Sequence, residues 1–231
     1  MILLIDGDPL VYRAAFSKEG DTISGLCDKL DKLVQEIFDK TKFFVDGKSY
    51  MIYLTGRSNF RKEITKTYKA QRKQEKPPLF QLVRQYLRDN YDTIESVGEE
   101  ADDLIAIEAT KHSPEDVVIV SLDKDFLQVP SRNYNPMRDE WTVVEEWPAT
   151  LFFWTQMLTG DTADNIKGVY KVGPVGAAKL YAECKTEAEL FEVCKRAYDG
   201  NMDRLKETGQ LLWLRRYEGE MWEPPNETIV S

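Results

Sequence analysis

Short apolar runs alternate with longer amphipathic stretches over the first two thirds of the chain. The runs at residues 1–5, 50–54 and 117–122 are each followed by polar residues or glycine, which is typical of buried strands that end in a turn. The helical spacing of apolar residues predicts helices over 26–38, about 59–73, 79–89 and 100–111.

This order of strands and helices predicts an α/β fold with a central, mostly parallel sheet flanked by helices. In sheets of this kind, ligands bind outside the carboxyl ends of the strands. Asp6 and Asp123 each follow a predicted strand directly. We therefore expect both carboxylates to lie at the same edge of the sheet.

The pattern changes after about Trp147 to helix, turn and helix, with no convincing strand. We expect an α/β core over residues 1–147, which contains a basic region at about 57–90, and a helical module over 148–231. Glycine and proline cluster in the module, where we expect a DNA-binding hairpin at about 160–185. A chain of 231 residues is long enough for one ordinary domain with such an addition.

Composition narrows the class of protein. Apolar residues make up 42% of the chain, which is globular, and no apolar run approaches the ~20 residues that cross a bilayer. Asp6 and Asp8 interrupt the first apolar run too early for a secretory leader. The three cysteines form no C-x-x-C pair, which suits a reducing compartment. We expect a cytoplasmic protein, with the host cytoplasm as its location if a phage encodes it.

Charge is distributed unevenly. The net charge of −9 argues against a polyanionic partner, but residues 57–76 carry eight bases and two acids, whereas 99–125 carry nine acids and two lysines. Such a separation favours cation binding in one place and polyanion binding in another. The single histidine, His112, excludes zinc sites with several imidazole ligands and is interpreted as structural or solvated.

The acidic residues form four clusters at topologically compatible places. Two clusters follow predicted strands, a third opens the predicted helix 100–111, and a fourth lies in the module. Their members are Asp6, Asp8, Glu99, Glu100, Asp102, Asp103, Asp123, Asp125, Asp161 and Asp164. Oxygen ligands without histidine or cysteine indicate Mg²⁺ or Mn²⁺. The alternative for any single cluster is ordinary helix capping or turn formation.

A basic stripe is expected on the predicted helix at about 59–73. Spacings of four and three place its members on one face: Lys62, Lys66, Lys69, Lys73 and Lys76. Few acids lie at pairing distance, so these lysines can contact phosphates. The alternative is an ordinary solvated face.

A glycine-rich turn in the module offers a second contact with phosphates. Gly173 allows a sharp turn, and Pro174 suits the first position of a helix that begins there. The start of that helix presents backbone amides to a phosphate without reading base sequence. Lys171, Gly176 and Lys179 lie in the same segment.

Five motifs together resemble the 5′-3′ exonuclease and flap endonuclease family, most of all its bacteriophage members, over residues 1–197. They are Ile-Asp6-Gly, Phe60-Arg61-Lys-Glu with Tyr68-Lys69-x-x-Arg72, Gly98-Glu-Glu100-Ala-Asp102-Asp103, Ser121-Leu-Asp123-Lys-Asp125, and Gly160-Asp161-x-x-Asp164-Asn. The resemblance implies a PIN-like nuclease fold with a helix-three-turn-helix module that grips duplex DNA and can hold a K⁺ ion.

The resemblance also implies roles for single residues. Asp6, Glu100, Asp102, Asp103 and Asp123 resemble the ligands of one metal cluster, and Asp125, Asp161 and Asp164 those that complete a second ion site. Lys69 and Arg72 match a cationic pair at the scissile phosphate, and Arg13 a basic residue near the 5′ side of the substrate. Tyr68 is open to two interpretations, stacking on a terminal base or packing inside the sheet.

Two departures from the family pattern bear on these roles. Thr55 and Gly56 follow the second predicted strand, where family members carry an aspartate, so one ligand is missing or is supplied by Asp8. Lys171 stands where a glycine is common, which affects cation binding at the hairpin and adds a phosphate contact.

The resulting hypothesis is a two-metal 5′ nuclease that cleaves duplex DNA at 5′ ends or 5′ flaps during replication, repair or primer removal. An RNA–DNA hybrid remains an alternative substrate, and a monomer is expected. Two other functions stay open. One is a non-catalytic DNA-binding replication accessory protein with a degenerate metal site, and the other is a PIN-type ribonuclease that does not need the hairpin.

Overall fold

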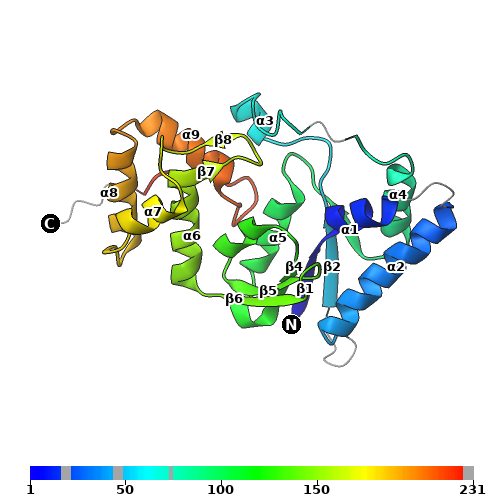
Figure 1. The fold of residues 1–231 in the computed structure, drawn as a ribbon. Coiled ribbons are helices and arrows are strands. Elements are labelled where there is room, and N and C mark those ends of the chain that lie inside the picture. Colours follow the sequence, from blue (N-terminus) through cyan, green and yellow to red (C-terminus); the bar gives the residue numbers. More distant parts are fainter. Residues whose placement is uncertain (17–21, 44–48, 73–74, 226–231) are drawn as a thin grey trace. The chain divides into compact units, whose positions relative to one another are not determined.

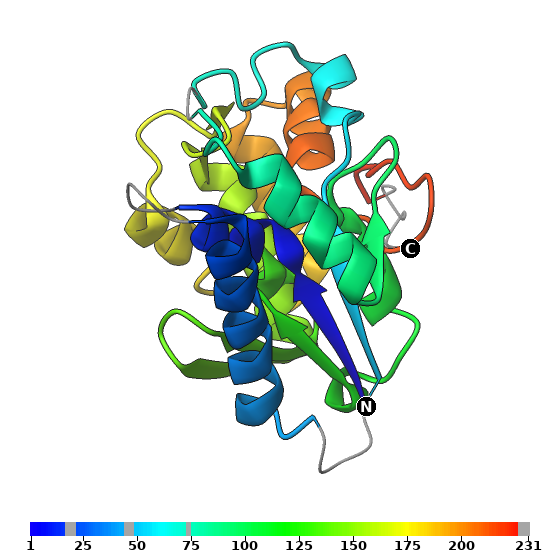
Figure 2. The same ribbon diagram turned by 90° about the vertical axis from the view of Figure 1, so that its right-hand side faces the viewer.

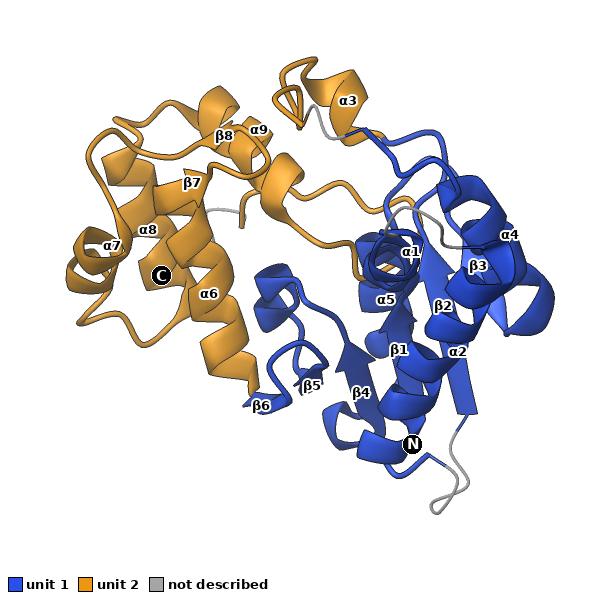
Figure 3. Ribbon diagram, turned by 45° about the vertical axis from the view of Figure 1, so that its right-hand side comes forward, with its two compact units in different colours: residues 1–59, 74–144 blue, residues 60–73, 145–231 orange. Residues whose placement is uncertain are grey.

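The computed structural model describes residues 1–16, 22–43, 49–72 and 75–225, so Lys73 of the predicted basic stripe lies outside the described residues. The chain divides into two compact units (Figure 3). Unit 1 contains residues 1–59 and 74–144, and unit 2 contains residues 60–73 and 145–231. Among the described residues, none of the helices has the length and apolar character needed to cross a membrane.

Unit 1 is built on a six-stranded sheet with the order β3-β2-β1-β4-β5-β6. All neighbouring strands are parallel except β5 and β6. The strands are β1 (Ile2–Asp6), β2 (Ser49–Leu54), β3 (Thr93–Glu95), β4 (Val117–Val120), β5 (Ser131–Asn135) and β6 (Glu140–Val144). The predicted α/β class with a mostly parallel sheet is therefore confirmed, and β4, buried at every position, is its most apolar strand.

Helices cover both faces of this sheet. Helices α1 (Gly7–Ala15), α2 (Ile23–Lys40) and α4 (Phe80–Asn90) bury their apolar sides in one core with alternate residues of the central strands (Figure 2). Helix α5 (Ala101–Ala109) packs against β1, β2 and β4. It lies on the other face of the sheet. Burial, and after it the negative charge of Glu108 in α5, raises the pKa of Tyr53, so Tyr53 points toward α5. Ile52 and Leu54, on either side of Tyr53 in β2, point the opposite way into the first core.

The turn from β1 into α1 fixes the position of Asp6. Asp6 ends the strand and occupies the N-cap position of the helix, and Gly7 follows it. A Cβ atom on Gly7 would lie 2.7 Å from Ile52 Cγ2 and 2.9 Å from the Tyr53 carbonyl oxygen. Glycine is therefore needed for α1 to start this close to β2.

Unit 2 is helical around a second core. Its helices are α3 (Arg61–Ile64), α6 (Glu146–Thr159), α7 (Pro174–Leu180), α8 (Glu187–Ala197) and α9 (Met202–Leu212). Trp154, Phe153 and Trp222 are buried members of this core. Strands β7 (Gly160–Asp161) and β8 (Ile166–Lys167) form a short antiparallel pair. The expectation of no strand after Trp147 is wrong at these four residues, which are too few to carry a pattern.

The predicted helix over 59–73 is also wrong. Helix α3 ends at Ile64, and Thr65 adopts an extended conformation. Beyond it the chain forms short turns, such as the one closed by the Arg72 amide and the Lys69 carbonyl, and it also bonds to the β7–β8 loop. The Lys69 amide donates to the Asp164 carbonyl, and Gln71 Nε2 donates to the Thr162 carbonyl. The lysines at 62, 66 and 69 therefore do not share one helical face, while Lys76 belongs to unit 1.

Candidate metal centre and its cationic partners

Asp6 and Asp123 lie at the carboxyl edge of neighbouring parallel strands, as the sequence predicts. The Ser121 hydroxyl donates to Asp6 Oδ2 over 2.9 Å, and its oxygen accepts the Asp123 amide at 3.0 Å. Because β1 and β4 pair directly, their ends are held side by side. Ser121 is a residue that the sequence analysis did not assign to the site.

The surroundings of Asp6 disfavour the ionised form of its side chain. Burial, followed by the negative charge of Asp8 and then that of Asp123, raises the pKa of Asp6 to about 7, although the Ser121 hydrogen bond acts in the opposite direction. The side chain is 8% exposed. An added positive charge would therefore stabilise the ionised form of this edge.

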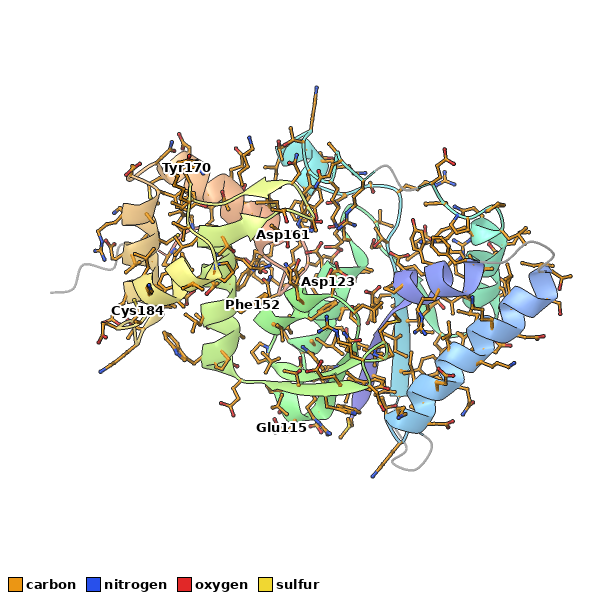
Figure 4. All side chains as sticks on the ribbon, in the orientation of Figure 1. Glu115, Asp123, Phe152, Asp161, Tyr170 and Cys184 are labelled. Atoms are coloured by element: carbon orange, nitrogen blue, oxygen red, sulfur yellow. The ribbon has the colours of Figure 1, made fainter. Side chains whose placement is uncertain are left out.

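Asp123 also shapes the turn that follows it. Its Oδ1 accepts the Asp125 amide at 2.9 Å at the start of a 3₁₀ turn over Lys124–Gln128. Asp123 is exposed, and Asp125 is half-buried with its Oδ1 3.3 Å from Lys124 Nζ. Figure 4 shows the Asp123 side chain among the sticks of this edge.

The acids of α5 serve the start of that helix. Glu100 is the N-cap residue, and Asp103 Oδ2 accepts the Glu100 amide at 3.1 Å in a capping box. Asp103 is fully buried, Glu100 is 8% exposed, and Asp102 is half-buried in the first turn. The capping interpretation thus describes Asp103 as it stands in this structure.

Asp8 has partners that the sequence analysis missed. Its Oδ1 accepts from Arg84 Nη1 at 2.8 Å, and its Oδ2 accepts the Thr55 amide at 3.0 Å. Arg84 Nη2 also donates to the Thr55 carbonyl at 2.6 Å and lies 3.5 Å from Glu95 Oε2. Both oxygens of Asp8 are therefore engaged, which disfavours Asp8 as the replacement for a missing metal ligand.

Thr55 and Gly56 stand where family members carry an aspartate, and these two positions differ in the space that they offer to a side chain. The Thr55 hydroxyl accepts the Ala101 amide at 3.1 Å and so links β2 to the start of α5. A Cβ atom on Gly56 would lie only 1.9 Å from the Ser96 carbonyl oxygen. Only position 55 can accept a side chain without a backbone shift.

Arg13 lies near the same edge. It lines a small pocket together with Asp6, Ser121 and Pro136. Since Arg13 is in the last turn of α1, its guanidinium belongs to the unit that carries Asp6. This places a cation beside the acidic edge.

The donors at this edge fit a divalent cation. They are carboxylate oxygens, which Mg²⁺ and Mn²⁺ prefer, and the crowding that raises the pKa of Asp6 is the effect that a cation would relieve. Within the described residues, no three His, Cys, Asp or Glu side chains are close enough to hold one ion as they stand.

In unit 2, Asp164 is surrounded by the predicted cationic pair. Arg72 Nη2 donates to Asp164 Oδ1 at 2.5 Å, and Lys69 Nζ lies 3.6 Å from Oδ2. Asp161 Oδ1 accepts the amides of Ala163 and Asp164, which fixes the β7–β8 turn. The motifs imply two different roles for these residues, and no pattern in the sequence predicts their contact.

Tyr68 is buried in unit 2 and not in the sheet. It is 4% exposed and belongs to the core around Trp154, and its hydroxyl donates to Asp164 Oδ2 at 3.2 Å. A ring in this position cannot stack on a base without leaving the core. Of the two interpretations, burial is the one observed, although in the helical unit.

Arg61 anchors the segment that carries Lys69 and Arg72. Its Nε donates to the Leu211 carbonyl at 2.9 Å and its Nη2 to the Trp213 carbonyl at 2.7 Å, at the end of α9. Its guanidinium also lies 4.6 Å from the centre of the Phe60 ring. Arg61 is 2% exposed. The motif indicated its importance but not this role.

The backbone of the hairpin adopts, at Lys171, the conformation that is usual for glycine. Lys171 has a φ of +61°, in the left-handed region, so a lysine adopts the conformation expected for the usual glycine. Gly173 is the N-cap of α7, and Pro174 is its first residue, as predicted. Lys171 and Lys179 are exposed, and Tyr170, labelled in Figure 4, is 82% exposed on the same turn.

Comparison with known proteins shows the family of this chain. Residues 1–150 match the 5′-3′ exonuclease N-terminal resolvase-like domain. The chain belongs to the 5′-3′ exonuclease family. It is 32% identical to DNA polymerase I of Rhizobium leguminosarum over 90% of its length, and 30% identical to a 5′-3′ exonuclease of Buchnera aphidicola subsp. Schizaphis graminum over 74%.

Structural similarity supports the fold. The flap endonuclease of bacteriophage T5, solved with DNA and metal ions, superposes with a TM-score of 0.65 at 17% identity, over 91% of this chain and 88% of that chain. The chain covers 22% of the polymerase and 66% of the Buchnera exonuclease. The resemblance seen in the motifs is thus confirmed at the level of family and fold.

Proposed function

We propose that this chain is a metal-dependent 5′ nuclease that hydrolyses phosphodiester bonds at 5′ ends or 5′ flaps of duplex DNA. The observation that carries the proposal is the acidic edge where Asp6, Ser121 and Asp123 meet, in a chain of the 5′-3′ exonuclease family. We propose that it acts in the cytoplasm in replication, repair and primer removal. An RNA–DNA hybrid would be a second substrate.

We assign metal binding to acids of each unit. In unit 1, Asp6, Glu100, Asp102, Asp103 and Asp123 would hold one Mg²⁺ or Mn²⁺, and Asp125 would be a ligand of a second ion; in unit 2, Asp161 and Asp164 are the candidate ligands. Such ions activate a water molecule and stabilise the leaving oxygen. The residues already crowd negative charge at Asp6, which supports cation binding there.

The cations act on the substrate phosphate. Lys69 and Arg72 would offset the charge that grows on the nonbridging oxygens, and Arg13 would hold the 5′ side. In this structure Asp164 neutralises Lys69 and Arg72, so substrate binding would exchange a carboxylate partner for a phosphate.

The duplex would be held by its backbone. We assign this contact to Lys62, Lys66, Lys73, Lys76, Lys171, Gly173, Gly176 and Lys179, with K⁺ at the hairpin. Contacts to phosphates select the structure of the DNA and its end but not its base sequence. Binding should therefore weaken steeply with salt.

The test is cleavage of a 5′-labelled duplex and a 5′ flap in Mg²⁺. Asp123→Asn and Asp102→Asn should each lose at least about a hundredfold in rate, because metal affinity and charge stabilisation are both lost. Asp116→Asn is the matched control, since Asp116 is exposed at the opposite end of β4. Undiminished cleavage by both site variants would refute the metal role.

A second candidate function is favoured by the engagement of Asp8. With Thr55 in place of an aspartate and Asp8 bound to Arg84, the metal site lacks one ligand. A non-catalytic DNA-binding accessory protein would bind flaps selectively and show no turnover in Mg²⁺ or Mn²⁺. The same cleavage assay on the wild-type chain separates the two functions.

A further inference from the structure

Unit 1 carries a second polar pocket at the opposite end of the sheet from the acids. It has a volume of about 390 Å³, within the range of small-ligand sites. Met1 lines the pocket at the start of β1, whereas Asp6 ends that strand. A strand of five residues separates the two places by roughly 16 Å. Figures 1 and 2 show the N-terminus and the end of α2 at this end of unit 1.

Among the described residues, those that line this pocket include cations and no acid. Lys40, Lys42 and Arg132 are among the lining residues. Lys40 Nζ donates to Asp139 Oδ2 at 2.5 Å. In the part of the chain that the structure describes, neither Lys42 nor Arg132 forms an ion pair with a carboxylate. Two positive charges therefore face the pocket without a neutralising partner there.

Lys42 occupies a position where glycine is usual. The Lys42 amide donates to the Asp39 carbonyl, and the Phe43 amide donates to the Phe38 carbonyl, which together form a Schellman motif at the end of α2. Lys42 has a φ of +54°, a conformation that costs a lysine free energy.

The carbonyl groups at the end of α2 are already bonded. Besides the two bonds of the Schellman motif, Thr41 Oγ1 donates to the Ile37 carbonyl at 2.8 Å. These bonds reduce the negative potential that the helix end would otherwise direct at an anion. The pocket is therefore suited to a negatively charged ligand despite its place at a helix C-terminus.

The remaining wall is apolar and aromatic. Trp141 is 41% exposed, and the Arg132 guanidinium lies 5.4 Å from the centre of its ring. Val118 and Met1 complete the apolar part of the lining. A ligand that matches both parts has a phosphate for the cations and a planar ring for the indole and the apolar side chains.

We propose that this pocket binds a nucleoside monophosphate, with the phosphate at Arg132 and Lys42 and the base against Trp141. The proposal deepens the proposed function in one respect, because a 5′ nuclease releases such nucleotides. Binding at this site does not require the acidic edge.

The test is isothermal titration of dAMP into the full chain in EDTA at low salt. Arg132→Gln should weaken binding by about tenfold or more, since a charge-assisted hydrogen bond to phosphate is lost. Lys42→Asn should weaken it about threefold without lowering the midpoint of thermal unfolding, because asparagine accepts the left-handed conformation. Lys32→Gln, on the exposed side of α2, is the control.

Three results would overturn the proposal: no heat with dAMP up to millimolar concentration, equal affinity in wild type and both pocket variants, or equal affinity for inorganic phosphate and dAMP. Asp123→Asn should bind dAMP like wild type. Because the titration contains no divalent ion, its failure leaves the proposed nuclease function untouched, and a loss of nuclease function leaves this binding intact.

Discussion

Replacing Asp6 with asparagine should stabilise the metal-free protein at neutral and alkaline pH. The pKa of Asp6 is raised from 3.8 to about 7, chiefly by burial and then by Asp8. A raised folded-state pKa means that the carboxyl group favours the folded state below pH 3.8 and that this contribution is lost as the pH rises through 7. Asparagine keeps the acceptor for Ser121 and removes the buried charge.

The size of the effect follows from the same shift. A pKa raised from 3.8 to about 7 corresponds to about 4 kcal/mol of unfolding free energy at roughly 1.36 kcal/mol per pKa unit. The advantage of Asp6→Asn over wild type should therefore grow with pH and approach about 4 kcal/mol by pH 8. Carboxylates remote from Asp6 titrate alike in both proteins and cancel in the difference.

Urea denaturation in EDTA at pH 5, 6, 7 and 8 measures this difference. Asp116→Asn is again the control, because Asp116 is exposed and lies at the opposite end of β4 from the acidic edge. Added Mg²⁺ should stabilise wild type and leave Asp6→Asn unchanged, which narrows the gap. An advantage that is absent at pH 8, or that shrinks as the pH rises, would contradict the reasoning.

Four further substitutions test other parts of the structure. Gly56→Ala should lower the free energy of unfolding, measured by urea denaturation, by more than about 2 kcal/mol, because its Cβ would lie 1.9 Å from the Ser96 carbonyl oxygen. Thr55→Asp should fold normally and should bind Mn²⁺ more tightly than wild type in calorimetry. Lys171→Gly should keep or gain up to about 1 kcal/mol of stability while duplex binding weakens in a filter-binding assay. Arg61→Lys should destabilise unit 2 by about 2 kcal/mol or more, seen as an earlier unfolding transition by Trp fluorescence, because a lysine cannot bond both carbonyls. Equal stability of Arg61→Lys and wild type would show that the anchor is unimportant.

The sequence was sufficient for the elements that follow a simple period. Strands β1 and β4 are continuous apolar runs, and α2 has a clear apolar stripe, so all three were predicted within a few residues. Strand β5 was missed because its sequence, SRNYN, is polar. Residues 65–72 were wrongly predicted as helical, because their conformation depends on hydrogen bonds to the β7–β8 loop, which no local pattern reveals.

The candidate site was predictable to the extent that topology determines it. Asp6 and Asp123 meet because they end adjacent parallel strands. Arg84 was missed, although a signal existed: it shares the buried face of α4 with Val83 and Leu87, where an arginine needs a partner. The pairing of Asp164 with Arg72 has no such signal, since 92 residues separate them.

The most direct measurement of the central claim is the anomalous scattering of a crystal soaked in Mn²⁺. We expect a peak within ligand distance of the carboxylates of Asp6 and Asp123 at the carboxyl edge of the sheet, and we expect Asp123→Asn to lose this peak. The claim would be contradicted if the protein cleaves DNA and yet the map of its soaked crystal shows these carboxylates apart and without an ion.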